Sequence, residues 1–185
     1  MTNMNELQII AGCKEQKREA QKMLYEVYAR KMYSICLRYS SDQDAAQDLL
    51  QDGFMKVFAN IDSFQDRGSF EGWLKRIFIN LALENLRKKK SIIQTSDDVQ
   101  NLPDVVDDST EDEQMYKISE GELLKMVQDL PRGYSTVFNL YAIEDYSHKE
   151  IAEMMGISEG TSRSQYVRAR NILQEKVKQY IKERS

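Results

Sequence analysis

The residues best suited to chemistry lie near the end of the chain, in the stretch SHKEIAEMMGISEGTSRSQYVRARNIL (147–173). Arg163, Ser164, Val167 and Arg168 recur there at spacings that place them on one side of a helix. An Arg side chain can fork onto guanine, a Ser hydroxyl can bond a base or a phosphate, and a Val methyl group can touch a thymine methyl group. The pattern therefore predicts a helix that reads base edges in DNA.

Two short helices and a tight turn are expected to position these side chains. The first helix packs through Ile151, Ala152 and Met155. Gly156 supplies a left-handed turn residue, which an L side chain resists, and Ser158 is expected to cap the second helix. This order of elements predicts a helix-turn-helix, whose second helix enters the major groove.

The second helix is expected to have two faces. Ser162, Tyr166, Ala169 and Leu173 are spaced to share the buried face, while Asn171 joins the base-reading residues on the other. The helix N-terminus, Glu159 to Thr161, would point its amides at a phosphate. A plain helical hairpin with solvated arginines is the alternative interpretation. His148 is expected to be exposed and without a partner.

A second candidate site lies in DSFQDRGSFEGWLKRIFINLALENLRKKK (62–90). Aromatic residues beside a polar loop offer stacking faces, and basic residues on the following helix offer phosphate contacts; they are Phe64, Phe70, Trp73, Lys75, Arg76, Arg87 and Lys88. That combination suits single-stranded or opened nucleic acid. Phe70 and Trp73 could instead belong to the core, and for Trp73 this is the favoured interpretation.

Composition and periodicity predict an all-α protein. With 2 Pro and 8 Gly among 185 residues, long helices are favoured over turn-rich β architecture. Apolar residues keep a helical period along an inner face of 24–36 (Leu24, Val27, Tyr28, Met32, Ile35 and Cys36), and also along 44–58, 70–89, 119–130 and 132–143. The last of these is expected to bury Val137, Phe138, Leu140 and Tyr141. We expect two small helical domains, at 1–92 and 115–185, joined by a flexible acidic linker at 93–114.

Charge is segregated along the chain. The formal net charge is −4, yet residues 96–130 hold 11 acidic and only 2 basic side chains, so both ends of the chain are mildly basic. A local field decides whether a surface meets phosphate, so the acidic total does not exclude DNA binding. The linker carboxylates could alternatively bind a divalent metal, mimic nucleic acid or pack along a basic groove of a partner.

The remaining composition points to the cytoplasm. The N-terminus has a short apolar run and no basic stretch ahead of it, so it does not resemble a signal peptide. No apolar run is long enough to span a bilayer. Cys13 and Cys36 are expected to be reduced, buried or idle, and two such residues do not make a metal framework.

Three ordered segments together resemble a known family. They are DAAQDLLQDGFMKVF, FQDRGSFEGWLKRIFINLALENLRKK and LPRGYSTVFNLYAIEDYSHKEIAEMMGISEGTSRSQYVRAR. They are similar to the two domains of the extracytoplasmic-function (ECF) sigma factors, compact members of the sigma-70 family. The resemblance covers nearly all of the chain outside the linker.

The resemblance implies a role for each segment. The helix around 44–58 would bind core RNA polymerase, at the β′ clamp coiled coil, through Asp44, Asp48, Leu49, Gln51, Asp52 and Phe54. The opened −10 promoter element would be held by Phe64, Arg67, Ser69, Lys75, Arg76, Asn80, Arg87 and Lys88, with a flipped base in the loop 65–69. The −35 element would be read by Thr161, Arg163, Ser164, Val167 and Arg168.

The resemblance also implies further partners. Besides promoter DNA and the polymerase β′ and β subunits, an anti-sigma factor is expected, which in this family is often membrane-bound. The linker would run toward the RNA exit path. Ser162, Gln165, Tyr166 and Val167 depart from the usual pattern, which implies an altered −35 sequence.

Two other classes of protein remain as alternatives. One is a stand-alone helix-turn-helix regulator whose first domain senses a ligand; the other is an enzyme, such as a nuclease that uses the linker carboxylates with a metal. The sequence predicts no catalytic residues, metal, cofactor or small-molecule substrate.

Overall fold

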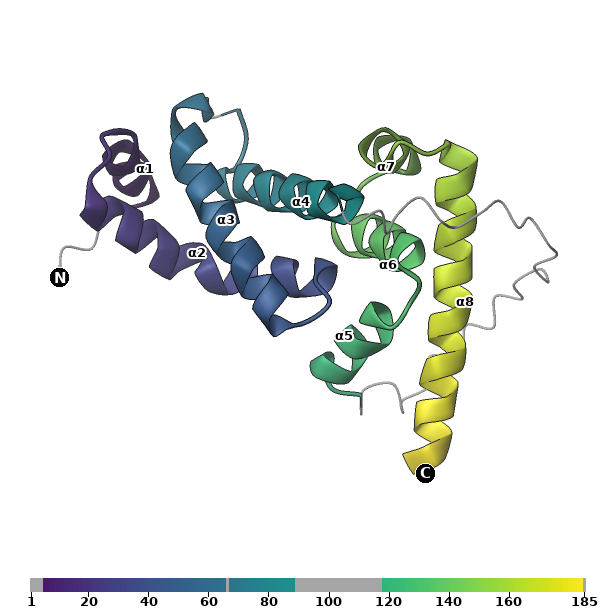
Figure 1. The fold of residues 1–185 in the computed structure, drawn as a ribbon. Coiled ribbons are helices and arrows are strands. Elements are labelled where there is room, and N and C mark those ends of the chain that lie inside the picture. Colours follow the sequence, from purple (N-terminus) through teal and green to yellow (C-terminus); the bar gives the residue numbers. More distant parts are fainter. Residues whose placement is uncertain (1–4, 66, 89–117, 185) are drawn as a thin grey trace. The chain divides into compact units, whose positions relative to one another are not determined.

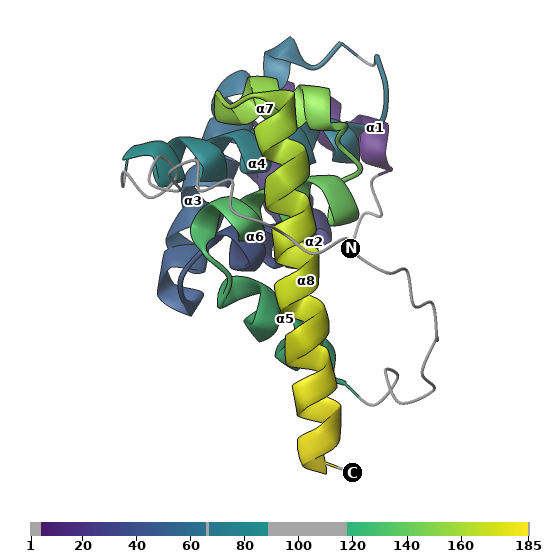
Figure 2. The ribbon, with the colours of Figure 1, turned by 90° about the vertical axis from the view of Figure 1, so that its right-hand side faces the viewer.

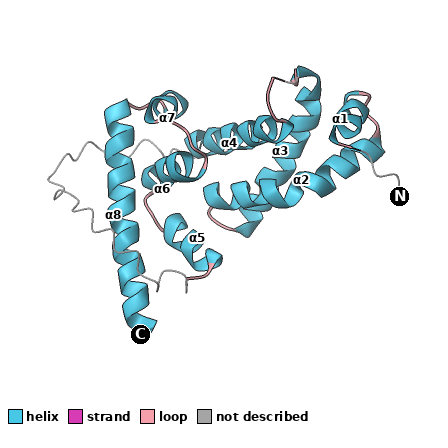
Figure 3. Ribbon diagram, turned by 180° about the vertical axis from the view of Figure 1, so that it is seen from behind, coloured by secondary structure: helices cyan, strands magenta, loops and turns pink. Residues whose placement is uncertain are grey.

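The structure, a computed structural model, describes residues 5–65, 67–88 and 118–184. Every regular element across those residues is a helix, and Figure 3 draws them without a strand. This confirms the all-α prediction. The chain forms two compact units, residues 1–85 and 86–185. The expected linker at 93–114 lies outside the described residues, so the three-part division into domains stays a prediction.

The first unit is built from a run of helices joined by short connections (Figure 1). They are α1 (Glu6–Lys14), α2 (Arg18–Tyr39), α3 (Gln43–Asn60), the 3-10 turn η1 (Ile61–Ser63) and most of α4 (Phe70–Lys88). Asn5 forms a capping box with Gln8 at the start of α1, and the Asp42 carboxylate accepts the Ala45 amide at the start of α3. Such caps satisfy first-turn amides that have no partner within the helix. The helix predicted along 44–58 is confirmed by α3.

Helices α2, α3 and α4 supply most of the core of the first unit. Their most deeply buried side chains include Leu24, Met32, Ile35, Cys36, Val57, Leu74 and Phe78. The predicted inner face of α2 is wrong at Val27, whose side chain is 58% exposed. The buried stripe follows the i, i+4 spacing of Leu24, Tyr28 and Met32, and Val27 falls outside its edge.

Both cysteines are free and buried, as the sequence predicts. Burial raises the pKa of the Cys13 thiol to about 11 and that of the Cys36 thiol to about 12. Because the thiolate is the reactive form, neither side chain is poised for thiol chemistry at neutral pH.

One glycine decides how closely α3 and α4 approach each other. A Cβ atom added at Gly53 would lie 2.1 Å from Cε1 of Phe78, which is fully buried. The neighbouring Phe54 ring meets the same Phe78 ring edge-on, with centroids 5.4 Å apart. The missing side chain at Gly53 therefore makes the space that Phe78 fills.

The second unit is organised along one long helix (Figures 1 and 2). Its elements are α5 (Glu120–Gln128), α6 (Arg132–Phe138), the π-helical turn η3 (Asn139–Ile143), α7 (His148–Met155) and α8 (Glu159–Arg184). Helices α5, α6 and α7 all pack against α8. Ser119 and Ser147 form capping boxes with Glu122 and Glu150 at the starts of α5 and α7.

The core of the second unit forms where α6, α7 and α8 meet. Val137, Leu140, Ile151 and Ala169 are fully buried. Tyr141, expected in this core, is 38% exposed instead. The cause is the wider turn at η3, where the Glu144 amide donates to the Asn139 carbonyl, because a wider turn rotates the following residues away from the α-helical period.

The close approach at Gly53 yields the first prediction. We expect Gly53→Ala to destabilise the first unit by about 1–3 kcal/mol, because the added methyl group overlaps the Phe78 ring. Trp73 is the only tryptophan and contacts Phe64 and Phe70 in this unit, so its fluorescence in a denaturant titration reports the effect.

Gly121→Ala in α5 is the matched control, since a Cβ atom there meets nothing within 4 Å. Circular dichroism should show it neutral or stabilising by up to about 1 kcal/mol. Equal stability of Gly53→Ala and the parent would contradict this account of the crossing.

Candidate nucleic-acid and polymerase interfaces

The turn between α7 and α8 forms as the sequence predicts. Gly156 adopts the left-handed conformation, with φ 69° and ψ 35°, and its amide closes α7 on the Ala152 carbonyl. The Ser158 hydroxyl then accepts the Thr161 amide at 2.9 Å, which caps the start of α8. The helix-turn-helix and both residues that shape it are therefore confirmed.

The buried face of α8 differs in part from the prediction. Ser162 and Ala169 are fully buried, as expected, but Gln165 joins them at 5% exposure while Tyr166 and Leu173 are only half-buried. The stripe is thus centred on the 162, 165 and 169 positions. Since Gln165 is buried, it does not belong to the exposed surface of α8 that is predicted to face DNA.

Of the two arginines predicted to read bases, only Arg163 is exposed on α8. The Arg163 side chain is 63% exposed and pairs with Glu159 one turn earlier on the same helix. Arg168, expected on the same open face, is half-buried instead, and its Nη1 donates to the Tyr134 hydroxyl of α6 at 3.2 Å. The two arginines therefore have different environments, which periodicity alone did not reveal.

The other predicted base-reading residues of α8 are half-buried. Thr161 and Ser158 share a hydroxyl–hydroxyl bond of 2.8 Å, and the Ser164 hydroxyl donates to the Thr161 carbonyl at 3.0 Å. Val167 has no polar group to satisfy and lies on the same side as Ser164 and Arg163. The first two turns of α8 thus form a small polar surface around Arg163.

The expectation for His148 is wrong. The ring is half-buried, its Nδ1 lies 2.9 Å from the Ser162 hydroxyl, and it stacks on Tyr141 with centroids 4.2 Å apart and planes 9° apart. Burial, followed by the charge of Arg163, lowers the pKa of His148, while Glu159 acts in the opposite direction. The signal in the sequence was the serine on a buried helix face, because a buried hydroxyl needs a partner.

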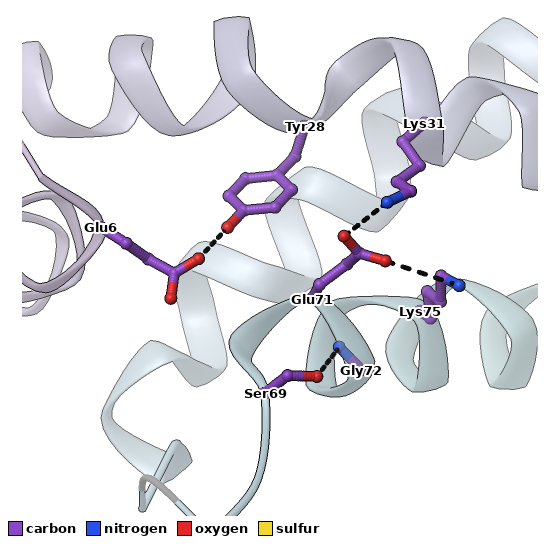
Figure 4. Close-up of polar contacts among 7 residues, drawn as sticks. All are labelled: Glu6, Tyr28, Lys31, Ser69, Glu71, Gly72 and Lys75. Atoms are coloured by element: carbon purple, nitrogen blue, oxygen red, sulfur yellow. Dashed lines mark hydrogen bonds and ion pairs between the residues drawn. The ribbon is translucent and has the colours of Figure 1, made fainter.

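A second polar face runs along α4. Arg76 and Asn80 are exposed one turn apart, and Arg67 and Ser69 are exposed in the preceding loop. The Ser69 hydroxyl accepts the Gly72 amide at 3.1 Å and so caps the start of α4 (Figure 4). At the other end of the helix, Arg87 and Lys88 are also exposed. These predicted −10 residues therefore share an accessible surface.

The aromatic residues beside this loop form a cluster rather than open stacking faces. Phe64 and Phe70 are buried, at 6% and 2% exposure, and meet edge-on with centroids 5.0 Å apart. Half-buried Trp73 packs within 5.6 Å of Phe64 and 5.5 Å of Phe70. Phe64 was expected to contact DNA, but its ring is buried under the loop and packs in the aromatic cluster. The Lys14 Nζ donates a hydrogen bond to the Phe64 carbonyl at 3.1 Å.

Lys75 does not lie with the other basic residues of α4. Its Nζ is 3.5 Å from Glu71, and the same carboxylate accepts Lys31 of α2 at 2.5 Å (Figure 4). The hydrogen bond from Lys31 is the main reason that the pKa of Glu71 is lowered. Lys75 is thus part of an ion-pair bridge between α2 and α4, which the sequence prediction of a phosphate contact did not foresee.

The predicted polymerase-binding residues of α3 fall into an exposed group and a buried group. Asp44, Asp48, Gln51 and Asp52 are exposed. Leu49 and Phe54 are buried, at 4% and 3% exposure. The two buried side chains were expected at the contact; they hold the helix to the core, although Phe54 also reaches the hollow beside it.

That hollow lies between α2 and α3 and has a volume of about 570 Å³. Its lining is mainly aromatic and aliphatic, with two glutamines: Tyr25, Tyr33, Gln47, Leu50, Gln51, Phe54, Met55 and Phe58. Met55 and Tyr25 are 64% and 45% exposed. Large apolar side chains at such exposure often mark a binding surface. Sequence reasoning missed both residues, although Met55 follows Gln51 and Asp52 on the same side of α3.

A helix-turn-helix with an exposed arginine, in a chain that has a second helical unit with an apolar hollow, is typical of a DNA-binding protein. Residues 24–92 match the family described as Sigma-70 region 2, and residues 120–173 match Sigma-70, region 4. The chain is 30% identical over 170 residues to the ECF RNA polymerase sigma-E factor of Haemophilus influenzae, covering 86% of this chain and 88% of that protein. It is 28% identical over 163 residues to the ECF sigma factor SigW of Bacillus subtilis, covering 84% and 87%.

A solved structure agrees with these relatives. The sigma factor RpoE of Bartonella quintana, in complex with the anti-sigma factor NepR, superposes with a TM-score of 0.55 at 27% identity, covering 85% of this chain and 96% of that one. The chain belongs to the ECF sigma factors of the sigma-70 family. It is an RNA polymerase sigma factor, which directs transcription initiation and is not an enzyme.

The described residues contain neither a membrane-spanning helix nor a cluster of metal ligands. No helix there is long and apolar enough to cross a membrane. No group of three or more His, Cys, Asp or Glu side chains in that part of the chain could hold a metal ion. The linker carboxylates lie outside it.

The different environments of the two arginines yield a prediction about stability. We expect Arg168→Ala to destabilise the second unit by about 0.5–1.5 kcal/mol, because it removes the hydrogen bond to Tyr134. Arg163→Ala should cost less than about 0.5 kcal/mol, since its ion pair is exposed. Denaturant unfolding followed by circular dichroism measures both.

Tyr134→Phe removes the same hydrogen bond from the other side, so it should not add to Arg168→Ala in the double variant. If Arg163→Ala and Arg168→Ala proved equally mild, the bond from Arg168 to Tyr134 would contribute nothing to the fold.

Proposed function

We propose that three surfaces of this sigma factor have separate roles in transcription initiation. The first turns of α8 read the −35 element, the exposed face of α4 holds the opened −10 element, and the outer side of α3 binds core polymerase. The observation that carries the proposal is the exposed Arg163, held directly after the Gly156 turn in a chain of the sigma-70 family. The cytoplasm, where core polymerase acts, is the location this function requires.

Reading of the −35 element centres on Arg163. Its guanidinium is free to exchange Glu159 for a guanine, and a bidentate contact of this kind discriminates by about 1–3 kcal/mol. Ser164 and Val167 flank it on the same side. Arg168, held by Tyr134, is better placed to steady α8 or meet a phosphate than to search for a base.

The −10 element is assigned to the accessible residues of α4 and of the loop that precedes it. Arg76, Arg87 and Lys88 supply positive charge along the helix, and Asn80 offers both donors and an acceptor to an unpaired base. The loop with Arg67 and Ser69 rests on the aromatic cluster of Phe64, Phe70 and Trp73. A loop supported in this way can receive a base without collapsing into the core.

The polymerase contact is assigned to the α2–α3 hollow and its acidic border. Met55 and Tyr25 offer an apolar centre, and Asp44, Asp48 and Asp52 carry negative charge on the same helix as Met55. A partner helix with apolar side chains and a basic edge fits this chemistry. Within core polymerase, the β′ clamp coiled coil is the assigned partner, with the β subunit as the further contact of the second domain.

An anti-sigma factor is proposed as a third partner. The Bartonella RpoE structure contains such a protein, NepR. A protein inhibitor that covered the hollow on α3 would block core polymerase directly, because the inhibitor and the polymerase would then compete for the same surface.

The polymerase surface is tested by charge reversal. We expect Asp48→Lys to weaken binding to core polymerase by about tenfold, because it replaces an attraction with a repulsion at the border of the contact. Asp62→Lys in the turn after α3 is the charge-matched control, and its affinity should stay close to that of the parent. Fluorescence anisotropy with labelled sigma factor measures both, and equal loss in the two variants would mean that only net charge matters.

The base-reading assignment is tested by promoter selection. Arg163→Ala, assembled with core polymerase, should relax selection at one −35 position in a randomised library, with a discrimination loss of about 5-fold to 100-fold. If Arg163 only touched phosphate, all sequences would weaken together. Selection of the parental sequence at the parental stringency would show that this side chain is not the base reader.

A further inference from the structure

A polar bond joins the two helices of the helix-turn-helix. Ser162 lies in the first turn of α8 with 0% exposure, and its hydroxyl lies 2.9 Å from Nδ1 of His148 in the first turn of α7. Leaving a buried hydroxyl without a partner costs about 1–3 kcal/mol. The hydrogen bond to His148 therefore offsets the cost of placing a serine hydroxyl on the buried face of α8.

Aromatic rings enclose this bond. The His148 ring stacks on Tyr141 of the π-helical turn at 4.2 Å, and the Tyr166 ring of α8 lies 5.9 Å from His148 and 4.6 Å from Tyr141. Tyr166 stacks in turn on Phe138 at 6.1 Å. The imidazole is thus fixed in position and orientation by side chains from two other elements.

The geometry points to His148 as a positioning residue for −35 recognition, which acts through Ser162 and holds the first turn of α8 most firmly while its ring is neutral. Arg163 is the residue directly after Ser162, so a shift of that turn moves the base-reading side chain. The inference rests on the proposed role of α8 in reading DNA.

Protonation would oppose this arrangement. In the neutral ring, Nδ1 either donates to the Ser162 hydroxyl or accepts from it, depending on the tautomer. The imidazolium can only donate, because both of its nitrogens carry a proton, and it brings a positive charge into the site. Arg163 repels that charge and Glu159 attracts it, while the half-buried ring, packed against Tyr141 and Tyr166, leaves less room for water to hydrate the charge. Burial and Arg163 together lower the pKa of His148 below its ordinary 6.5.

The sign of the pH effect follows. Above pH 6.5 the ring is neutral whether the chain is folded or unfolded, and the bond is at full strength. As pH falls below that value, the unfolded chain takes up the proton first, so the folded arrangement loses stability until the pH passes the lowered folded pKa. The added charge would attract phosphate of any sequence, so the loss appears in −35 discrimination and not in total affinity.

The test uses holoenzyme assembled from the full chain and core polymerase. The readout is the ratio of binding to a promoter selected by the parent and to the same promoter with a scrambled −35 element, from about pH 8 to about pH 5.5. His148→Phe keeps the stack and loses the bond; Ser162→Ala loses the bond and keeps the histidine. Each should lower the ratio about 3-fold to 10-fold at the upper pH, and the double variant should lose little more.

Two further variants separate positioning from simple stability. His148→Gln can still bond Ser162 but cannot titrate, so it should restore the ratio and remove its fall with acid. Glu153→Gln, at an exposed position on α7, is the control and should keep the parental profile. A His148→Phe ratio equal to that of the parent, or an acid-induced fall that persists in His148→Gln, would overturn the inference.

The Arg163→Ala variant in the same assay separates failure of the proposed −35 reading by α8 from failure of the positioning role of His148. If Arg163→Ala leaves discrimination unchanged, α8 is not the −35 reader and the inference falls with the proposed function. If Arg163→Ala loses discrimination while His148→Phe and Ser162→Ala keep it, the reading function stands and the positioning role of His148 is wrong.

Discussion

The crossing of α3 and α4 at Gly53 is the constraint on which the first unit depends. Phe78 fills the space left by the missing side chain, so two amphipathic helices meet through their apolar sides with almost no gap. The outer sides of both helices are then exposed, one with aspartates and Met55, the other with Arg76 and Asn80. The buried contact lies between these two outer faces. Polymerase binding can therefore be assigned to one face of this small unit and binding of the opened DNA strand to the other.

The chain handles a polyanion in spite of its net charge of −4 because charge is distributed by segment and by helix face. The exposed arginines of α4 and α8 lie away from the acidic stretch in the sequence. Where an acidic residue does stand beside a basic one, the pair has a local role: Glu71 joins Lys31 to Lys75, and Glu159 holds Arg163. The Glu71 bridge ties α2 to α4, while the exposed Glu159–Arg163 pair joins residues one turn apart on α8.

Most of the helices, the cap at Ser158 and the turn at Gly156 were predictable, because each depends on residues adjacent in the sequence; the short helix α1 was not predicted. What the sequence could not show depends on contacts between elements. The burial of Phe64, the ion pairing of Lys75 and the bond from Arg168 to Tyr134 each need a neighbour from a distant segment. Tyr141 and His148 were misplaced for one shared reason: a π-helical turn, invisible to a 3.6-residue period, brings the tyrosine out over the histidine.

The central claim is that α3 faces protein and α8 faces DNA in the same initiation complex. Site-specific photocrosslinking measures it most directly, with benzoylphenylalanine introduced at Met55 in one sample and at Arg163 in another. In holoenzyme bound to a promoter, the Met55 probe should crosslink to a polymerase subunit and the Arg163 probe to DNA at the −35 element. Crosslinks from Met55 to DNA, or from Arg163 to polymerase with no DNA adduct, would contradict the account.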